Sequence, residues 1–429
     1  MIYKITTKQK TQKKGKKILL LDFNLVTNKS TLESLSDSEF NLLISNTRRP
    51  VIWNRESLKI AKKLNFKEIK LEYNTKDNHI KLNEIMKKFI EFIRSNDFLV
   101  NIFTINNKSF WSIFESDFIV FCEKRFSEIL FFIDSLEELS NKEDIKLLIT
   151  LDDSQQIGRT ATMFYNKIGI PTILSLNTDI NIFYDQKRNW EVFTLYKIYA
   201  DKFAIYGNLS KQICLDHKVD SNKLVITGNP RYDELFNRKV RTTDNYILIT
   251  LSGIASTAWS TFFSSLLILK YENMFKEVLN SLSKYKKNVV IKLHPTQDSV
   301  IDVKGIVNEI LPHAQIYKNA NTYDLISNAE LVISPSSSVI TEALILDKPV
   351  FLFKFLANDS GIPYEKYNAV LATESINEIG SKIEHILFDK NIRRDLEVGR
   401  KRFLEHVLEY QGNSSEEIIK LVKSLTNSI

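Results

Sequence analysis

The stretch "LVISPSSSVITEALILDKPVFLF", residues 331–353, decides the fold. An apolar run ends at Pro335, serines follow it, and a helical pattern leads through Lys348-Pro349 to a second apolar run. Strands that are continuously apolar and alternate with helices are typical of a parallel sheet covered on both faces. The stretch therefore predicts one strand-helix-strand unit of an open α/β sheet.

The same alternation runs through the chain in two series. Helical patterns such as residues 55–64 and 83–94 separate short β-branched runs, and the polar stretch 237–245 separates the two series. We expect strands at 16–23, 98–103, 145–151, 171–176, 201–206 and 223–228, and again at 246–253, 288–295, 314–319, 329–338 and 348–353. This pattern predicts an α/β protein with two tandem Rossmann-like parallel-sheet domains facing a cleft. The expected boundaries are 1–240, with a basic N-terminal tail, 241–410, and a C-terminal helix over 411–429.

Composition limits the class of protein. A chain of 429 residues with 43% hydrophobic and 26% charged residues is globular and large enough for two domains. Cys122 and Cys214 form no Cys-x-x-Cys pair, which favours a reducing cytoplasm over a disulfide framework. The formal net charge of +7 indicates acidic partners. Because no nucleic-acid-binding motif is visible, we expect phosphorylated small molecules or an anionic membrane face rather than nucleic acid.

Two segments raise the question of a membrane. Residues 246–269 carry no charge over 24 positions, but eight of these are Ser or Thr, so a strand, loop and helix are expected rather than a membrane span. The basic tail at 8–17 is interpreted as solubilising, with contact to anionic lipid as the alternative. The aromatic group Trp259, Phe262 and Phe263 is expected in the core, although it too is a candidate for the inner face of the cell membrane.

Ligands of open α/β sheets bind beyond the carboxyl ends of the strands. In the second half, three such ends carry candidate donor-binding residues: Ser252 and Gly253; His294 and Pro295; and Ser336, Ser337 and Ser338. At the start of a helix, serine hydroxyls and unpaired N–H groups suit an anion. A capping box fails because Thr341, not Glu or Gln, stands three residues after Ser338. A phosphate site is therefore favoured over a plain N-cap.

His294 ends an apolar run and precedes a proline that fixes the backbone where it leaves the strand. An imidazole there can bond a phosphate or a leaving group. An ordinary His-Pro turn is the alternative, and the serine cluster two strands further on favours the functional interpretation.

In the first half, Asp152 and Asp153 follow a strand, where paired carboxylates suit a general base. The alternative is that Asp153 or Ser154 caps the next helix. Arg159 is expected to face a phosphate or those carboxylates. Arg231, in "TGNPRYDEL" at 227–235, either lines the cleft or holds its own turn together.

Several chemistries have no motif in this chain. It has no Gly-x-Gly-x-x-Gly, no Walker loop, no Gly-x-Ser-x-Gly and no His-Glu-x-x-His. A dinucleotide enzyme, a P-loop ATPase, an α/β-hydrolase and a zinc protease are therefore disfavoured. We expect no cofactor and no metal.

Taken together, "VVIKLHP", "YDLISNAELVISPSSSVITEALILDKPVFLF" and "TGNPRYDEL" resemble bacterial surface-polysaccharide transferases of the GT-B fold. This group includes CDP-glycerol glycerophosphotransferases and the CMP-sugar-using sialyl- and Kdo-transferases. The resemblance covers residues 145–410. It implies that His294, Ser337 and Ser338 contact the donor phosphate. The segment "SSVITEA" is also similar to "GGxxEEA" of UDP-N-acetylglucosamine 2-epimerases, which implies that Glu342 bonds the nucleotide ribose.

The resemblance implies a metal-independent glycosyltransferase that moves a sugar from a CMP- or CDP-linked donor to a glycan or lipid-linked acceptor in surface polysaccharide synthesis. Asp152 or Asp153 would be the base. This chain has Ser154 where sialyltransferases have glycine after the acidic pair. The alternatives are a CDP-glycerol glycerophosphotransferase, a UDP-sugar 2-epimerase and a non-catalytic nucleotide-sugar-binding subunit.

Overall fold

A computed structural model describes residues 15–47, 49–71, 78–176, 197–238, 246–251, 265–294, 301–335, 337–355 and 362–427, and every structural statement below concerns these residues. The first sheet has seven strands in the order β3-β2-β1-β6-β7-β8-β9, all parallel. Its strands are β1 (Lys17–Leu21), β2 (Asn41–Ser45), β3 (Phe66–Glu68), β6 (Ile145–Thr150), β7 (Thr172–Ser175), β8 (Lys202–Ile205) and β9 (Leu224–Ile226).

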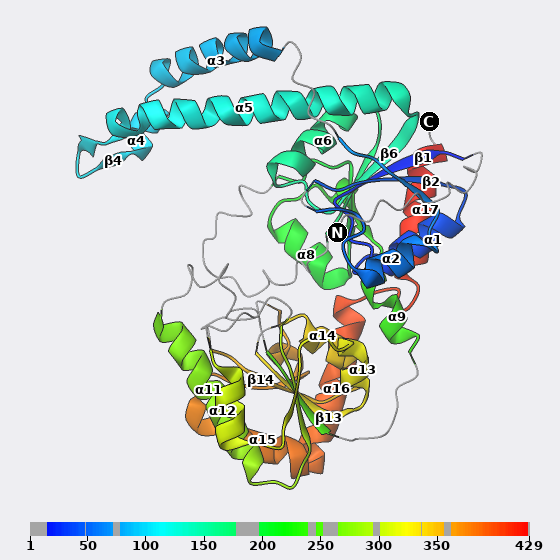
Figure 1. Ribbon diagram of the computed structural model, residues 1–429, viewed down its shortest axis with the longest axis vertical. Coiled ribbons are helices and arrows are strands. Elements are labelled where there is room, and N and C mark those ends of the chain that lie inside the picture. The colour runs from blue at the N-terminus through cyan, green and yellow to red at the C-terminus, as the bar shows by residue number, and fades with distance from the viewer. Residues whose placement is uncertain are drawn as a thin grey trace.

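The second sheet has six parallel strands in the order β12-β11-β10-β13-β14-β15. They are β10 (Tyr246–Thr250), β11 (Val289–Lys292), β12 (Gln315–Tyr317), β13 (Ala329–Ser334), β14 (Val350–Phe353) and β15 (Leu371–Thr373). Figure 1 shows the two sheets in separate halves of the molecule, each with helices around it. The predicted pair of parallel-sheet domains is confirmed.

Most predicted strands are present, and one prediction is wrong. Residues 98–103 form helix α4 (Phe98–Ile102) instead of a strand. The Asn96 side chain accepts a hydrogen bond from the Phe98 N–H at 2.8 Å and so starts a helical turn. The segment lies outside both parallel sheets, in an arm whose two described strands, β4 (Thr104–Ile105) and β5 (Lys108–Ser109), pair with each other. Strands β2, β3 and β15 are not predicted from the sequence, and the last two have only three residues each.

Helices cover both sheets. The first half contributes α1 (Lys29–Asp37), α2 (Arg55–Ala61), α6 (Gln156–Lys167), α8 (Asn208–Asp216) and α9 (Asp233–Phe236). The second half contributes α11 (Ser265–Ser283), α12 (Val303–Ile310), α13 (Thr322–Ser327), α14 (Val339–Ile345), α15 (Ile379–Phe388) and α16 (Lys390–Val407). One core packs α11, α12 and α15 on a face of the second sheet, and another continues from β8 through α16 to β13 and β14. The two halves therefore share apolar contacts.

The C-terminal helix α17 (Ser414–Asn427) returns to the first half. Its Ile418 and Val422 belong to the same buried cluster as Ile18 and Leu147 of the first sheet. The buried Asp233 carboxylate accepts hydrogen bonds from the N–H groups of the first two residues of α17, at 2.9 and 2.7 Å. The chain thus crosses twice between the halves.

A long helical arm projects from the first half (Figure 1). It consists of α3 (Asn78–Ser95), α4, the short hairpin β4 (Thr104–Ile105) and β5 (Lys108–Ser109), and the distal part of the 32-residue helix α5 (Trp111–Lys142). Helix α5 continues into the body, where Phe132 and Leu136 join a core with Leu148 of the sheet. Among the helices described, none is long and apolar enough to cross a membrane.

Candidate functional site

The carboxyl edge of the second sheet brings three polar side chains into one row. Lys292 pairs in register with Thr250. The Thr250 hydroxyl donates a hydrogen bond to the Ser334 hydroxyl at 2.8 Å, and both side chains are buried. Because neighbouring strands lie about 4.8 Å apart, the ends of β11 and β13 are roughly 10 Å apart across the end of β10. The segment after β11 leads to His294. The segment after β13 leads to the loop with Ser337 and Ser338, which we call the serine loop.

Lys292 is a functional candidate that the sequence analysis missed. It is only 6% exposed, and its ammonium group donates to the carbonyl oxygens of Leu293 at 2.8 Å and Lys318 at 3.0 Å. No carboxylate forms an ion pair with it within the described ranges. Burial lowers the pKa of Lys292, because a charged ammonium loses its hydration in the protein. A buried cation without a counter-charge suits an anionic ligand.

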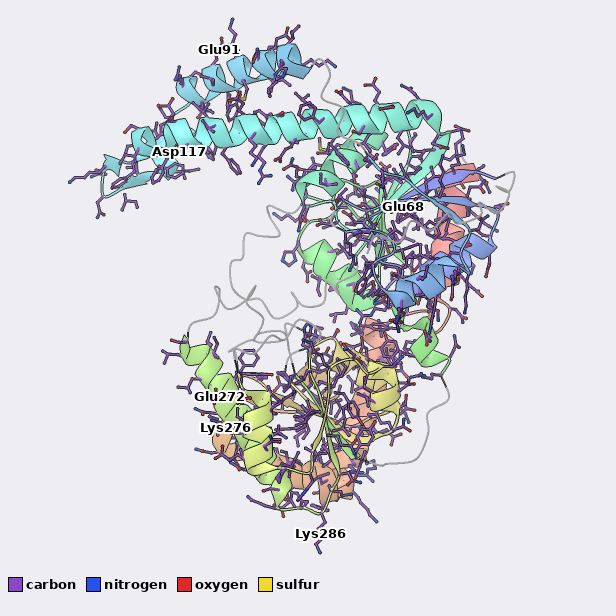
Figure 2. All side chains as sticks on the ribbon, viewed as in Figure 1. Glu68, Glu91, Asp117, Glu272, Lys276 and Lys286 are labelled. Atoms are coloured by element: carbon purple, nitrogen blue, oxygen red, sulfur yellow. The ribbon has the colours of Figure 1, made fainter. Side chains whose placement is uncertain are left out.

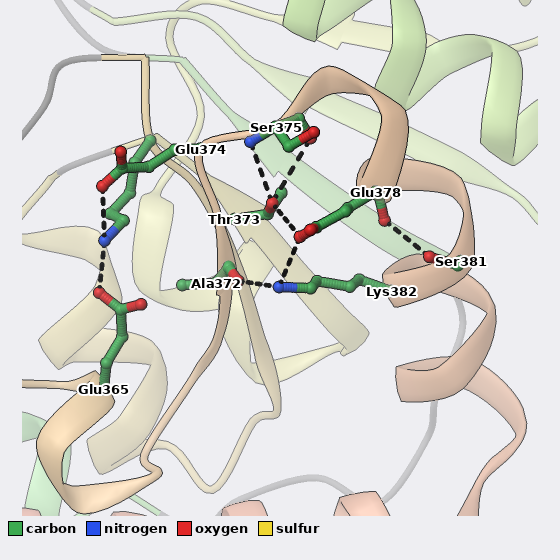
Figure 3. Close-up of polar contacts among 9 residues, drawn as sticks. Glu365, Ala372, Thr373, Glu374, Ser375, Glu378, Ser381 and Lys382 are labelled. Carbon is green, nitrogen blue, oxygen red and sulfur yellow. Dashed lines mark hydrogen bonds and ion pairs between the residues drawn. The ribbon is translucent and has the colours of Figure 1, made fainter.

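Lys354 provides a contrast at the same edge of the sheet. It follows β14, and its ammonium group bonds Glu365 at 2.6 Å and Glu374 at 3.1 Å. Figure 3 shows these two carboxylates converging from opposite sides, next to a separate network of Thr373, Glu378 and Lys382. Burial alone would lower the pKa of Lys354. The two carboxylates raise it by more, so the net shift of the pKa is upward. Lys354 therefore has its own counter-charges, whereas Lys292 has none among the residues that the structure describes.

His294 lies two residues beyond Lys292 and is half-buried. Burial and the positive charge of Lys292 both lower the pKa of His294, so the imidazole is neutral at pH 7. A neutral imidazole can donate one hydrogen bond and accept another. Pro295, which follows it, lies outside the described residues.

The serine loop leads into α14. Ser338 is the N-cap residue, and its exposed side chain makes no capping hydrogen bond. The half-buried Ser337 hydroxyl accepts a long hydrogen bond, 3.4 Å, from the Val339 N–H. Plain capping therefore does not account for the Ser338 hydroxyl. Because α14 has only seven residues, the hydroxyls offer more to an anion here than its dipole does.

Glu342 lies on α14 and meets Arg231 from the first half. The Arg231 guanidinium bonds the Glu342 carboxylate at 2.6 Å, and Glu342 is only 2% exposed. Tyr323 of α13 also bonds Arg231. Burial raises the pKa of Glu342, and the charge and hydrogen bond of Arg231 oppose that rise. Arg231 thus does more than hold its own turn, because it joins the two halves.

The ion pair leaves no solvent-accessible Glu342 carboxylate in this conformation. A ribose hydroxyl would have to share the carboxylate with Arg231 or replace it. The role of Glu342 as ribose ligand remains a prediction under that condition.

The acidic pair after β6 separates into two different environments. Asp153 is fully buried, and its Oδ2 accepts hydrogen bonds from the N–H groups of Tyr199 at 2.8 Å and Ala200 at 3.0 Å. It therefore anchors the segment before β8 and cannot reach a substrate in this conformation. Asp152 is half-buried, and its Oδ1 accepts from the Ser154 N–H at 2.8 Å, the Ser154 hydroxyl at 2.6 Å and the Gln155 N–H at 3.2 Å.

These contacts correct the expected capping pattern. Neither the Asp153 nor the Ser154 side chain caps α6, since Asp152 bonds the N–H groups that precede the helix. Gly158 allows α6 to pack against this loop, because a Cβ there would lie 1.6 Å from the Asp152 carbonyl oxygen. Asp152 is the member of the pair that remains a candidate base.

Arg159 bonds the Ser154 carbonyl oxygen at 2.6 Å, and its guanidinium lies 5.0 Å from the centre of the Tyr199 ring. It forms no ion pair with the acidic residues of the described chain, contrary to one of the two expectations. Its Nε is buried, and none of the described residues accepts a hydrogen bond from it. An anionic ligand is therefore the remaining expectation for Arg159. Several candidates lie outside the described residues, namely Ser252, Gly253, Ser336, Trp259, Phe262 and Phe263.

Comparisons with known proteins identify the fold. No family model matches the chain, and no curated protein matches its sequence. Among solved structures, a Staphylococcus aureus MnaA–UDP co-structure is similar with a TM-score of 0.59 and 14% identity, over 96% of this chain and 98% of that one. UDP-GlcNAc 2-epimerase from Neisseria meningitidis bound to UDP-GlcNAc matches with a TM-score of 0.58 and 14% identity, over 95% and 100%.

A third similar structure is the glycotransferase of kitacinnamycin, with a TM-score of 0.56 and 10% identity, over 96% of this chain and 99% of that one. Epimerases and glycosyltransferases of this kind share the GT-B architecture of two facing parallel-sheet domains. At these low identities the likeness establishes the fold alone. The chain has the GT-B fold.

Proposed function

We propose that this protein is a transferase that moves a sugar from a nucleotide-activated donor, CMP- or CDP-linked, to a glycan or lipid-linked acceptor in surface polysaccharide synthesis. The observation that carries the proposal is Lys292 beside His294 at the carboxyl edge of the second sheet: it is a buried cation to which the described residues offer no carboxylate partner. Leaving such a charge uncompensated costs free energy. A donor phosphate beside it would provide the missing negative charge.

Sugar transfer develops negative charge on the phosphate of the departing nucleotide. The bond between the anomeric carbon and the phosphate oxygen breaks, and the electron pair leaves with the nucleotide phosphate. Lys292, His294 and the hydroxyls of Ser337 and Ser338 are the groups proposed to stabilise that charge. The acceptor hydroxyl forms the new bond to carbon, and Asp152 is proposed to take its proton.

The strongest rival is an epimerase acting on a UDP-sugar. It is favoured by the structural likeness to UDP-GlcNAc 2-epimerases, with TM-scores of 0.59 and 0.58 for the two quoted above. An epimerase converts its nucleotide sugar without an acceptor, whereas a transferase releases nucleotide only when an acceptor is present. A CDP-glycerol glycerophosphotransferase would form a phosphodiester instead of a glycosidic bond. A non-catalytic binding subunit would bind nucleotide, and an Asp152→Asn variant would leave the activity of its complex unchanged.

The first experiment is a thermal-shift and calorimetric screen of the full chain with CMP, CDP, UMP and UDP. A ligand that binds only the folded chain adds about 2.7 kcal/mol at a hundredfold excess over its Kd. With an unfolding entropy of roughly 2.1 cal/mol/K per residue, this raises Tm by about 3 °C. A preference for cytidine over uridine nucleotides would support the transferase, and the reverse would support the epimerase.

Two matched variants test the site itself. Lys292→Met should weaken nucleotide binding at least tenfold, because it removes the uncompensated cation. Lys354→Met should bind like the wild type, because Lys354 already has Glu365 and Glu374 as partners. Equal binding by both variants, or no binding of any nucleotide by the wild type, would contradict the proposal.

A further inference from the structure

The helical arm exposes an unusual amount of apolar surface. Exposed large hydrophobic side chains of the described residues concentrate there, with exposed fractions between 37% and 73%. They are Ile80, Ile85, Phe92, Phe98, Ile102, Ile105, Phe110, Ile113, Phe114, Val120 and Phe121. At roughly 200 Å² for each side chain, they leave about 1,000 Å² of apolar surface in water. Patches of this size mark an interaction surface.

The exposed residues of α5 form a defined stripe. Helix α5 faces α3 through Phe118 and Phe126, whose rings lie 6.3 and 5.1 Å from the ring of Phe89. The side of α5 opposite Phe118 and Phe126 carries Ile113, Asp117, Val120 and Lys124. These four residues follow one another at spacings of four, three and four, so they lie on one line along the helix. All four are exposed. We call this line, together with the adjoining Phe114 and Phe121, the α5 stripe.

The α5 stripe is charged in a self-complementary way. Asp117 precedes its centre at Val120 and Phe121 by about one turn, and Lys124 follows it by about one turn. Neither Asp117 nor Lys124 forms an ion pair with another residue that the structure describes. If a second α5 lies antiparallel across this centre, Asp117 of each copy meets Lys124 of the other, and Val120 meets Phe121. A parallel arrangement would instead place like charges together.

We propose that the α5 stripe is the surface through which two copies of this chain associate, with their α5 helices antiparallel about a two-fold axis near Val120 and Phe121. The two-fold axis makes the interface isologous, so each apolar and charged contact occurs twice. At roughly 200 Å² for each side chain, the four apolar members of the α5 stripe expose about 460 Å². This is more than half of the about 800 Å² that each partner of a standard interface buries, and Asp117, Lys124 and the exposed residues beside them would supply the rest. The arrangement extends the α3–α5 pair into four helical layers.

The charge distribution favours a second copy over a lipid surface. Residues 78–127 contain seven basic and six acidic side chains, so the arm has little net attraction for anionic lipid. Asp117 lies within the α5 stripe itself, and burying its carboxylate in hydrocarbon would be costly. In a dimer the same carboxylate has Lys124 of the second copy as a partner.

Sedimentation equilibrium of the full chain tests this proposal. The wild type should be a dimer, and Val120→Lys should be a folded monomer, with the far-UV circular dichroism of the wild type and a Tm that no longer depends on protein concentration. Asp117→Lys and Lys124→Asp should each raise the dissociation constant about tenfold, since each change replaces two attractive contacts by two repulsive ones. The double exchange should restore dimerisation. Glu91→Lys is the matched control, because Glu91 lies on α3, away from the α5 stripe (Figure 2).

Three results would overturn the proposal. The wild type could be monomeric at every concentration tested. The dimer could persist in Val120→Lys, which would place the interface elsewhere. The double exchange could be as weak as the single changes. Flotation with phosphatidylcholine vesicles, with and without phosphatidylglycerol, is the parallel measurement: a monomer that floats, and that loses flotation on Val120→Lys, would assign the α5 stripe to a membrane.

Discussion

Replacing Arg231 by methionine tests the contact that joins the two halves. The Glu342 carboxylate has almost no solvent exposure and is held by Arg231 at 2.6 Å. Removing one partner of a buried pair costs about 3 to 5 kcal/mol, because the other charge is left without compensation. Since the Arg231 side chain is 31% exposed, water offsets part of the loss, and about 3 kcal/mol is expected. For unfolding of the whole chain this corresponds to about 3 °C in Tm.

The pH dependence of that loss has a definite sign. The pKa of Glu342 is already raised in the folded chain, so ionising its carboxylate costs stability as the pH rises above about 4.5. Without Arg231, nothing opposes the effect of burial, and the pKa of Glu342 rises further. The deficit of Arg231→Met relative to the wild type should therefore be largest above neutral pH. It should shrink as the pH falls and the carboxyl group is protonated.

Urea denaturation of four chains at pH 5 and pH 7.5 measures this prediction: wild type, Arg231→Met, Glu342→Gln and the double variant. A neutral amide needs no counter-charge, so the double variant should recover at least half of the loss at pH 7.5. Arg238→Met is the control, because its partner Asp324 is 61% exposed and that pair is worth less than about 1 kcal/mol. A free energy of unfolding for Arg231→Met within about 0.5 kcal/mol of the wild type, roughly the experimental error, would contradict this prediction. So would a double variant that is no more stable than Arg231→Met.

Three further predictions concern other parts of the molecule. Gly158→Ala should lower the free energy of unfolding by about 1 to 3 kcal/mol, because its Cβ would overlap the Asp152 carbonyl oxygen; an unchanged urea midpoint would contradict this. Asp233→Ala should cost about 2 kcal/mol and increase hydrogen exchange in α17, whose first two N–H groups lose their acceptor; unchanged exchange there would refute the anchoring role. Nucleotide affinity should rise as the pH falls toward 5.5, because a bound phosphate favours the protonated form of His294, whose pKa is lowered in the free protein. If His294→Asn shows the same dependence of affinity on pH, the effect belongs to the nucleotide and not to His294.

The fold was largely predictable because its strands carry their own signal. Runs such as Leu147–Ile149 are buried on both faces of a parallel sheet, so they are apolar without interruption and stand out from the amphipathic helices. Residues 98–103 carry the same β-branched and aromatic signal, but they form a helix in the arm, outside the two parallel sheets. Propensity is a weak signal when the tertiary environment differs. Only the three-dimensional arrangement distinguishes the two cases.

The site was predictable to a smaller extent. The position of a residue after a strand places it at a carboxyl edge, and this was enough to select His294 and the serine loop. Position does not reveal which polar neighbour a side chain finds. Asp152 and Asp153 are adjacent in sequence, yet one lies half-buried in a loop and the other is locked beneath Tyr199 and Ala200 by two backbone hydrogen bonds. The partners of Asp153 come from a segment more than 40 residues away.

Charge compensation distinguishes the buried cations that stabilise this fold from the one proposed to bind a ligand. Arg231 has Glu342 as its partner, and Lys354 has Glu365 and Glu374, so each of these cations is already satisfied in the free protein. Lys292 is as buried as a core residue, but within the described part of the chain its partners are carbonyl oxygens alone. Removing Arg231 should therefore lower stability, because it leaves a buried carboxylate behind. Removing Lys292 should not lower stability and should weaken nucleotide binding at least tenfold, since the charge it would compensate belongs to the ligand.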